Sequence, residues 1–185
     1  VFALSISSCN DFLDREPLSS VTPEVYFQTV DHFAAYSIAK YQNYFSSHGG
    51  YGAGIANNDG GTDNMVAGGR SSRYVKGLWK VPSSDGNWSF SNIRYCNYFF
   101  ENAVPKYEAG EVAGADADIR HYIGEMHLMR ALVYYNLLRN YGDFPIITEV
   151  LPDDKAVLME KGVRQPRNLV ARFILKDLDD AASMM

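Results

Sequence analysis

The stretch that decides the fold is GEMHLMRALVYYNLLRNYGDFP, residues 124–145. It belongs to a longer segment, 116–141, in which apolar residues recur at the spacing of one helix face. Gly142 is placed to end this helix, and Pro145 prevents its continuation. The segment therefore predicts a long helix with one buried stripe. That stripe consists of Ile119, Ile123, Met126, Val133, Leu137 and Tyr141, widened by Tyr134 and Leu138.

Upstream, the same spacing predicts a first helix from Thr22 to about Phe45, with a break near Thr29. Thr22 is a suitable N-cap, and Pro23 suits the first helical position. The buried stripe of this helix is expected at Ala34, Ile38, Tyr41 and Phe45.

Two more helices complete the pattern. One starts near Asp85 or Asn87 and ends at Pro105, and the other runs from about Pro166 to Met184. The residues expected to face inward are Trp88, Ile93, Cys96, Phe100 and Ala103 in the former, and Val170, Phe173, Ile174, Leu178 and Ala181 in the latter.

The expected fold class is all-α, built of tetratricopeptide-like helical hairpins. The helices on either side of the short 110–114 linker are expected to pack as an antiparallel pair. A long irregular loop, residues 49–86, separates the first two long helices and is rich in Gly, Asn, Asp and Ser. Loops of this length inside a compact domain are usually functional.

Composition excludes several functions. The chain has 185 residues, enough for one domain, and a net charge of −5 without a block of like charges. That distribution argues against a nucleic-acid partner. No run of eighteen apolar residues exists, so no transmembrane helix is expected. Thirteen Tyr and ten Phe are many for this length and suit helix cores or sugar-stacking faces.

The first residues have the character of a processing signal. Residues 1–8 are short, apolar and end in small residues before Cys9, so they are expected to be the remnant of a lipoprotein signal peptide. The ending Ile-Ser-Ser-Cys resembles a lipobox, in which Cys9 receives the lipid. The alternative is a frayed terminus with an incidental cysteine. Residues 9–21 then form an extended lipidated leash, and residues 22–185 form the helical domain.

Residues 124–145 contain a glutamate, an Arg-Ala pair, two adjacent aromatics and a leucine, followed by Tyr-Gly-Asp-x-Pro. In this order they closely resemble the signature of the SusD/RagB family. Further matches stand on both sides in the family's order. They are the segment Asp11–Asp14, then Trp88, Ile93, Asn97, Arg164, Val170, Ile174, Asp177, Leu178 and Ala181.

The resemblance implies a Bacteroidetes-type lipoprotein on the surface of the outer membrane. Such a protein binds a glycan, or in some relatives a peptide, and delivers it to a SusC-like TonB-dependent transporter without breaking a bond. It also implies that later helices and much of the ligand-binding surface lie beyond these residues. A tetratricopeptide-type adaptor that binds only protein remains the main alternative. An anchored glycoside hydrolase has little support, because no carboxylate pair stands out.

The signature residues themselves are expected to report the fold and not a site. Gly124 and Ala131 allow helices to approach closely. Tyr134, Tyr141 and Trp88 are expected to be core aromatics. Arg130, which lies in an apolar stripe, is expected to be a buried guanidinium bonded to carbonyls or to a carboxylate.

Ligand chemistry is expected in the loop instead. It offers forked polar side chains for pairs of hydroxyls and a planar ring for the apolar side of a sugar. The alternative is that these are ordinary turn residues. The candidate glycan-binding residues are Asp59, Asp63, Asn64, Arg70, Arg73, Tyr74 and Trp79.

No cofactor or metal site is predicted. The glycines of 50–54 lack the spacing of a nucleotide-binding loop, and none of the histidines forms a zinc motif. Residues 59–63 are similar to the start of a calcium loop but lack its final glutamate, which leaves a calcium site open.

Overall fold

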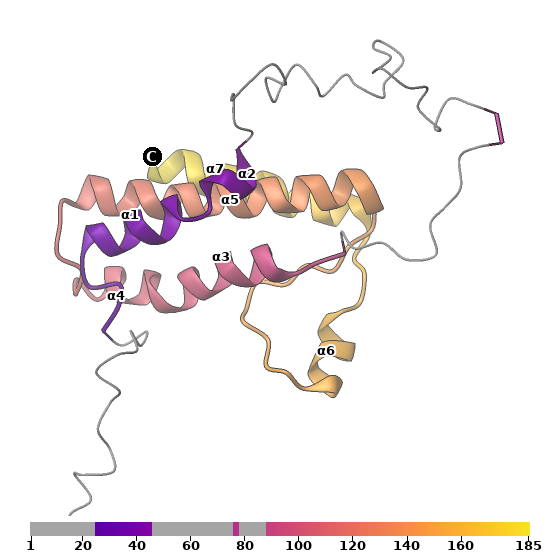
Figure 1. Cartoon of the computed structure of the whole chain (residues 1–185), viewed down its shortest axis with the longest axis horizontal. Helices are drawn as coiled ribbons and strands as arrows, with labels where there is room; N and C mark the ends of the chain where they lie inside the picture. Colours follow the sequence, from indigo (N-terminus) through magenta and orange to yellow (C-terminus); the bar gives the residue numbers. More distant parts are fainter. Residues whose placement is uncertain (1–24, 46–75, 78–87) are drawn as a thin grey trace, which may run out of the picture.

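The structure, a computed structural model, describes residues 25–45, 76–77 and 88–185. All regular secondary structure in these ranges is helical, which confirms the predicted all-α fold. Among the described residues, no helix combines the length and apolarity needed to cross a membrane. In chain order the helices are α1 (Val30–Ile38), α2 (Tyr41–Tyr44), α3 (Ser91–Asn102), α4 (Val104–Glu108), α5 (Asp116–Tyr141), α6 (Lys155–Lys161) and α7 (Arg167–Met184) (Figure 1).

The long helix α5 has the predicted bounds and is the element against which α1, α2, α3 and α7 pack (Figure 1). Gly142 follows it with a φ of 73°, a left-handed conformation that favours glycine, so its predicted capping role is confirmed. The start of the stripe is also confirmed, because Ile119, Ile123 and Met126 are buried. Val133 and Tyr141 are only half-buried.

Helix α7 lies antiparallel along α5 and makes its largest interface (Figure 1). A Cβ atom on Gly124 would lie 2.8 Å from Met185 Cγ and 3.0 Å from the carbonyl oxygen of Ala181. This confirms that Gly124 permits a close approach of the two helices. The buried residues of α7 include the predicted Val170, Ile174 and Ala181, together with Asp177. The prediction for Leu178 was wrong, because its side chain is 37% exposed.

The predicted phase of the first helix was also wrong. Phe33 and Ser37 are buried on α1, whereas Ile38 is 51% exposed and Phe45 is 46% exposed. The backbone leaves the helical conformation at Lys40, with φ −112° and ψ 2°, so that α2 does not continue the face of α1. The predicted single buried stripe through both helices therefore does not exist. The predicted start was wrong as well: residues 25–28 are not helical, and Thr29 precedes α1 in an extended conformation, so the helix begins only at Val30.

The second predicted helix is divided into two. It begins at Ser91, later than expected, and a turn at Ala103 separates α3 from α4. Pro105 does not end the helix as predicted but lies in the first turn of α4, where a missing N–H costs no hydrogen bond. The expected antiparallel packing of α3 against α5 is confirmed (Figure 1).

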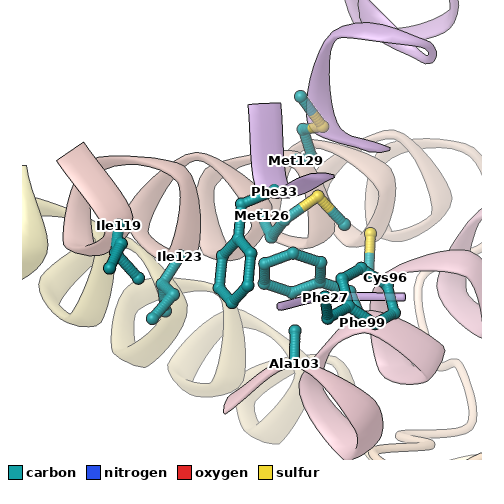
Figure 2. Packing of buried hydrophobic residues seen from close by; sticks show 9 residues of the cluster. All are labelled: Phe27, Phe33, Cys96, Phe99, Ala103, Ile119, Ile123, Met126 and Met129. Atoms are coloured by element: carbon teal, nitrogen blue, oxygen red, sulfur yellow. The ribbon is translucent and has the colours of Figure 1, made fainter. Parts of the chain in front are cut away.

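The core has two parts. The first, which we call the aromatic cluster, lies between α1, α3 and the first half of α5 (Figure 2). The rings of Phe27, Phe33 and Phe99 meet edge to face, with centroids 5.2–5.9 Å apart. The cluster is completed by Cys96, Ala103, Ile119, Ile123, Met126 and Met129.

The second part, the distal cluster, lies between α3, α7 and the second half of α5. Its fully buried rings belong to Tyr134 and Phe144. Trp88 is half-buried and packs on Phe144, with a centroid distance of 4.5 Å. The remaining buried members are Ile93, Ala131, Leu137, Val170 and Ile174.

Candidate functional site

The residues predicted for ligand and lipid binding lie outside the described residues. This holds for Cys9, for the possible calcium segment 59–63, and for every candidate of the loop: Asp59, Asp63, Asn64, Arg70, Arg73, Tyr74 and Trp79. The described residues on either side of the loop are informative, however. Tyr44 precedes it, Ser89 follows it, and both line the same hollow.

This hollow, which we call the asparagine hollow, has a volume of about 220 Å³. It is formed by α2, by the first residues of α3 and by one face of α5. Asn136 and Asn140 stand one helical turn apart on α5 and face the same side. The full lining is Asn43, Tyr44, Ser89, Asn92, Val133, Asn136, Leu137 and Asn140.

The lining combines polar and apolar side chains and carries no charged one. Each asparagine amide offers two N–H donors and one carbonyl acceptor, a combination that matches pairs of hydroxyl groups. Within the described part of the chain, the amides of Asn92, Asn136 and Asn140 have no hydrogen-bond partner in the protein. Burial raises the pKa of the Tyr44 phenol, so this ring stays neutral as well. The hollow is suited to a neutral, hydroxyl-rich molecule.

Buried polar groups that we call the Arg130 network join α3, α5 and α7. Arg130 donates from Nε to Asp177 Oδ2 (2.8 Å) and from Nη2 to Asp177 Oδ1 (2.7 Å). Its Nη1 donates to Asn97 Oδ1 (3.0 Å). The amide nitrogen of Asn97 in turn donates to the carbonyl oxygens of Ile147 (2.9 Å) and Glu149 (3.1 Å).

This geometry confirms that Arg130 is a structural guanidinium. The side chains of Arg130 and Asp177 are 8% and 1% exposed, which leaves them no access to a ligand. Burial alone would raise the pKa of Asp177, but hydrogen bonds from Arg130 and His127 outweigh it and hold the pKa below its usual range. The carboxylate therefore stays charged, and the pair is a satisfied buried ion pair.

Other residues of the sequence signature also have structural partners. Glu125 accepts hydrogen bonds from Ser37 Oγ and from the Tyr41 hydroxyl, which ties α1 and α2 to α5. Asp143 accepts from the backbone N–H of Arg167 (2.8 Å) at the start of α7. The signature thus describes how the helices are fastened together.

The lone group of possible metal ligands among the described residues is His127, Asp177 and Asp180. Both oxygens of Asp177 already accept hydrogen bonds from Arg130. A cation placed there would lie beside a guanidinium, which disfavours binding. We assign the group to the Arg130 network.

Sequence reasoning missed the asparagine hollow. A signal was present, because Asn136 and Asn140 occur at the four-residue spacing that places side chains on one helix face. What could not be foreseen is that α2 and α3 bring further asparagines to the same place.

No family model and no curated protein matches the chain. A solved structure of a SusD-like protein from Bacteroides fragilis is similar over 50% of this chain, with 27% identity and a TM-score of 0.41. The match covers 16% of that protein, so this chain spans a small part of its length.

Proposed function

We propose that the chain is part of a cell-surface, glycan-binding lipoprotein that delivers oligosaccharides to a SusC-like TonB-dependent transporter, and that it is not an enzyme. The observation that carries the proposal is the uncharged asparagine hollow. Its lining suits the hydroxyl groups of a neutral sugar. The loop predicted to bind glycan lies between Tyr44 and Ser89 in the sequence, and both of these residues line the hollow. The hollow and the predicted loop are therefore neighbours in the sequence.

The test uses isothermal titration of the full chain with a panel of neutral oligosaccharides. The double variant Asn136→Ala/Asn140→Ala should weaken binding by about tenfold or more, because two hydrogen-bonding side chains are lost. Asn168→Ala, an exposed asparagine at the start of α7 and outside the hollow, is the matched control. If the wild type, the double variant and Asn168→Ala bind sugar with equal affinity, the sugar site does not lie in the asparagine hollow. If none of the sugars binds to the wild type, the proposed glycan-binding function is contradicted.

A protein-binding adaptor is the second candidate, and one observation favours it. Helix α7 leaves the side chains of Leu175 and Leu178 60% and 37% exposed. Such apolar residues are often covered by a partner. Capture of protein without any sugar binding would favour this alternative.

Anchoring is proposed through a lipid on Cys9, at the outer membrane. Cys9→Ala should release the protein from membranes or leave an uncleaved precursor. Unchanged membrane fractionation, with an unmodified N-terminus in mass spectrometry, would contradict the anchor and leave the sugar site untouched.

A further inference from the structure

A second hollow lies on the other side of α3. It has a volume of about 310 Å³ and shares no lining residue with the asparagine hollow. We call it the apolar cavity, because most of its lining is hydrocarbon. The lining residues are Phe90, Ile93, Arg94, Asn97, Ile147, Glu149, Leu151, Leu158 and Gly162.

The outer wall of the apolar cavity is the segment 147–162, which includes α6. Hydrogen bonds fasten the first part of this wall, residues 147–151, to α3. Arg94 Nη1 donates to the carbonyl oxygen of Leu151 (2.6 Å), and the backbone N–H of Val150 donates to Glu101 Oε1 (2.5 Å). The amide of Asn97 holds the start of the same segment. This part of the wall is therefore held in place, and the Lys161–Glu149 ion pair links α6 to it.

One charge at the cavity is not neutralised. Glu149 forms an ion pair with Lys161 (2.7 Å), whereas Arg94 has no carboxylate partner among the described residues. Arg94 is exposed, and its remaining N–H groups are available to a ligand. An apolar cavity beside an unpaired guanidinium has the chemistry to hold an apolar body that carries one negative charge.

We propose that the apolar cavity is a binding site for a small anionic amphiphile, with its apolar body against Ile93 and Leu158 and its carboxylate or sulfonate on Arg94. The volume equals that of roughly ten water molecules, at about 30 Å³ each. It lies at the lower end of the range for small-molecule sites, so one fused aromatic body or a short acyl chain fits. The site is independent of glycan binding.

The test uses two fluorescent probes with the full chain. 1-Anilinonaphthalene-8-sulfonate carries an aromatic body and a sulfonate, and N-phenyl-1-naphthylamine has the same body without the charge. We expect saturable binding of both at one site, with the sulfonate bound more tightly. Arg94→Gln should weaken binding of the sulfonate by about tenfold, through loss of one charged contact, and should weaken binding of the neutral probe much less.

A matched pair on α6 locates the site. Leu158 lines the cavity, whereas its neighbour Met159 is 69% exposed and does not. Leu158→Asp places a negative charge on the cavity wall and should abolish binding of the sulfonate, while Met159→Asp should not change it. Circular-dichroism melting establishes that each variant is folded. The proposal is overturned by non-saturable binding, by equal effects of the two Asp variants, or by equal weakening of both probes in Arg94→Gln.

Discussion

The aromatic cluster and the Arg130 network hold α5 in the bundle by different kinds of contact. The first half of α5 contributes Ile123 and Met126 to the aromatic cluster, where burial is apolar. Near its middle, α5 contributes Arg130, which donates hydrogen bonds to α3 and α7. These hydrogen bonds form only when the three helices have one particular relative position. Apolar burial has no direction, whereas a buried guanidinium requires its acceptors at fixed positions. We infer that the aromatic cluster supplies much of the stability and that the Arg130 network fixes the register of the helices.

The largest expected effect comes from breaking the network. Asp177→Ala leaves the Arg130 guanidinium buried without its carboxylate, so the free energy of unfolding should fall by about 3–5 kcal/mol. Urea denaturation followed by circular dichroism measures this. Replacing both partners, as Arg130→Met/Asp177→Leu, should restore most of the loss because no charge is then buried unpaired. If the double variant is as unstable as the single one, the buried charge is not the cause.

The next largest effect is expected in the apolar packing of the distal cluster. Leu137 is 7% exposed in the distal cluster, and Leu137→Ala should cost about 2–5 kcal/mol through the cavity it leaves. Arg139 is exposed on the same helix, and Arg139→Ala should change stability by less than about 0.5 kcal/mol. Equal losses in urea denaturation would mean that the buried face of α5 has been assigned incorrectly.

The bounds of α5 could be predicted because the information is local. Periodicity, Gly142 and Pro145 all lie within or next to the helix. The face of α1 could not be predicted, because it depends on where the backbone turns at Lys40 and on how the Phe33 ring meets Phe27 and Phe99. Arg130 was correctly expected to be buried, yet its partner Asp177 lies 47 residues away and was read only as part of the family pattern.

The candidate sites show the same limit. The chemistry of a sugar site was sought in the polar loop, where residue types alone suggested it. The asparagine hollow, in contrast, needs α2, α3 and α5 to be assembled before its residues meet. The apolar cavity is missed for a related reason, since α6 and the segment that carries it have no strong periodic pattern.

A smaller effect should follow from pH. The pKa of Asp177 is below its usual range in the folded protein, so in acid the unfolded chain takes up the proton first. The carboxylate therefore contributes its full stability above the unfolded pKa of about 3.9, and this contribution is lost as the pH falls through the folded pKa. The difference in stability between the wild type and Asp177→Asn should have its full value at pH 6 and shrink below about pH 4. A difference that does not change with pH would show that the carboxylate charge is not what matters.

The smallest expected effect comes from a change of shape within the aromatic cluster. Met126 is fully buried among rings and apolar side chains, and Met126→Leu keeps its volume and apolar character. Because such a cluster has no directional requirement, the loss should stay below about 1.5 kcal/mol. Asp177→Asn is the matched change in the network, since it also keeps the shape of the side chain but removes the charge that Arg130 requires. At pH 6 it should cost more than Met126→Leu in the same urea titration. The reverse order would mean that close packing of the rings, and not the Arg130 network, fixes how the helices lie.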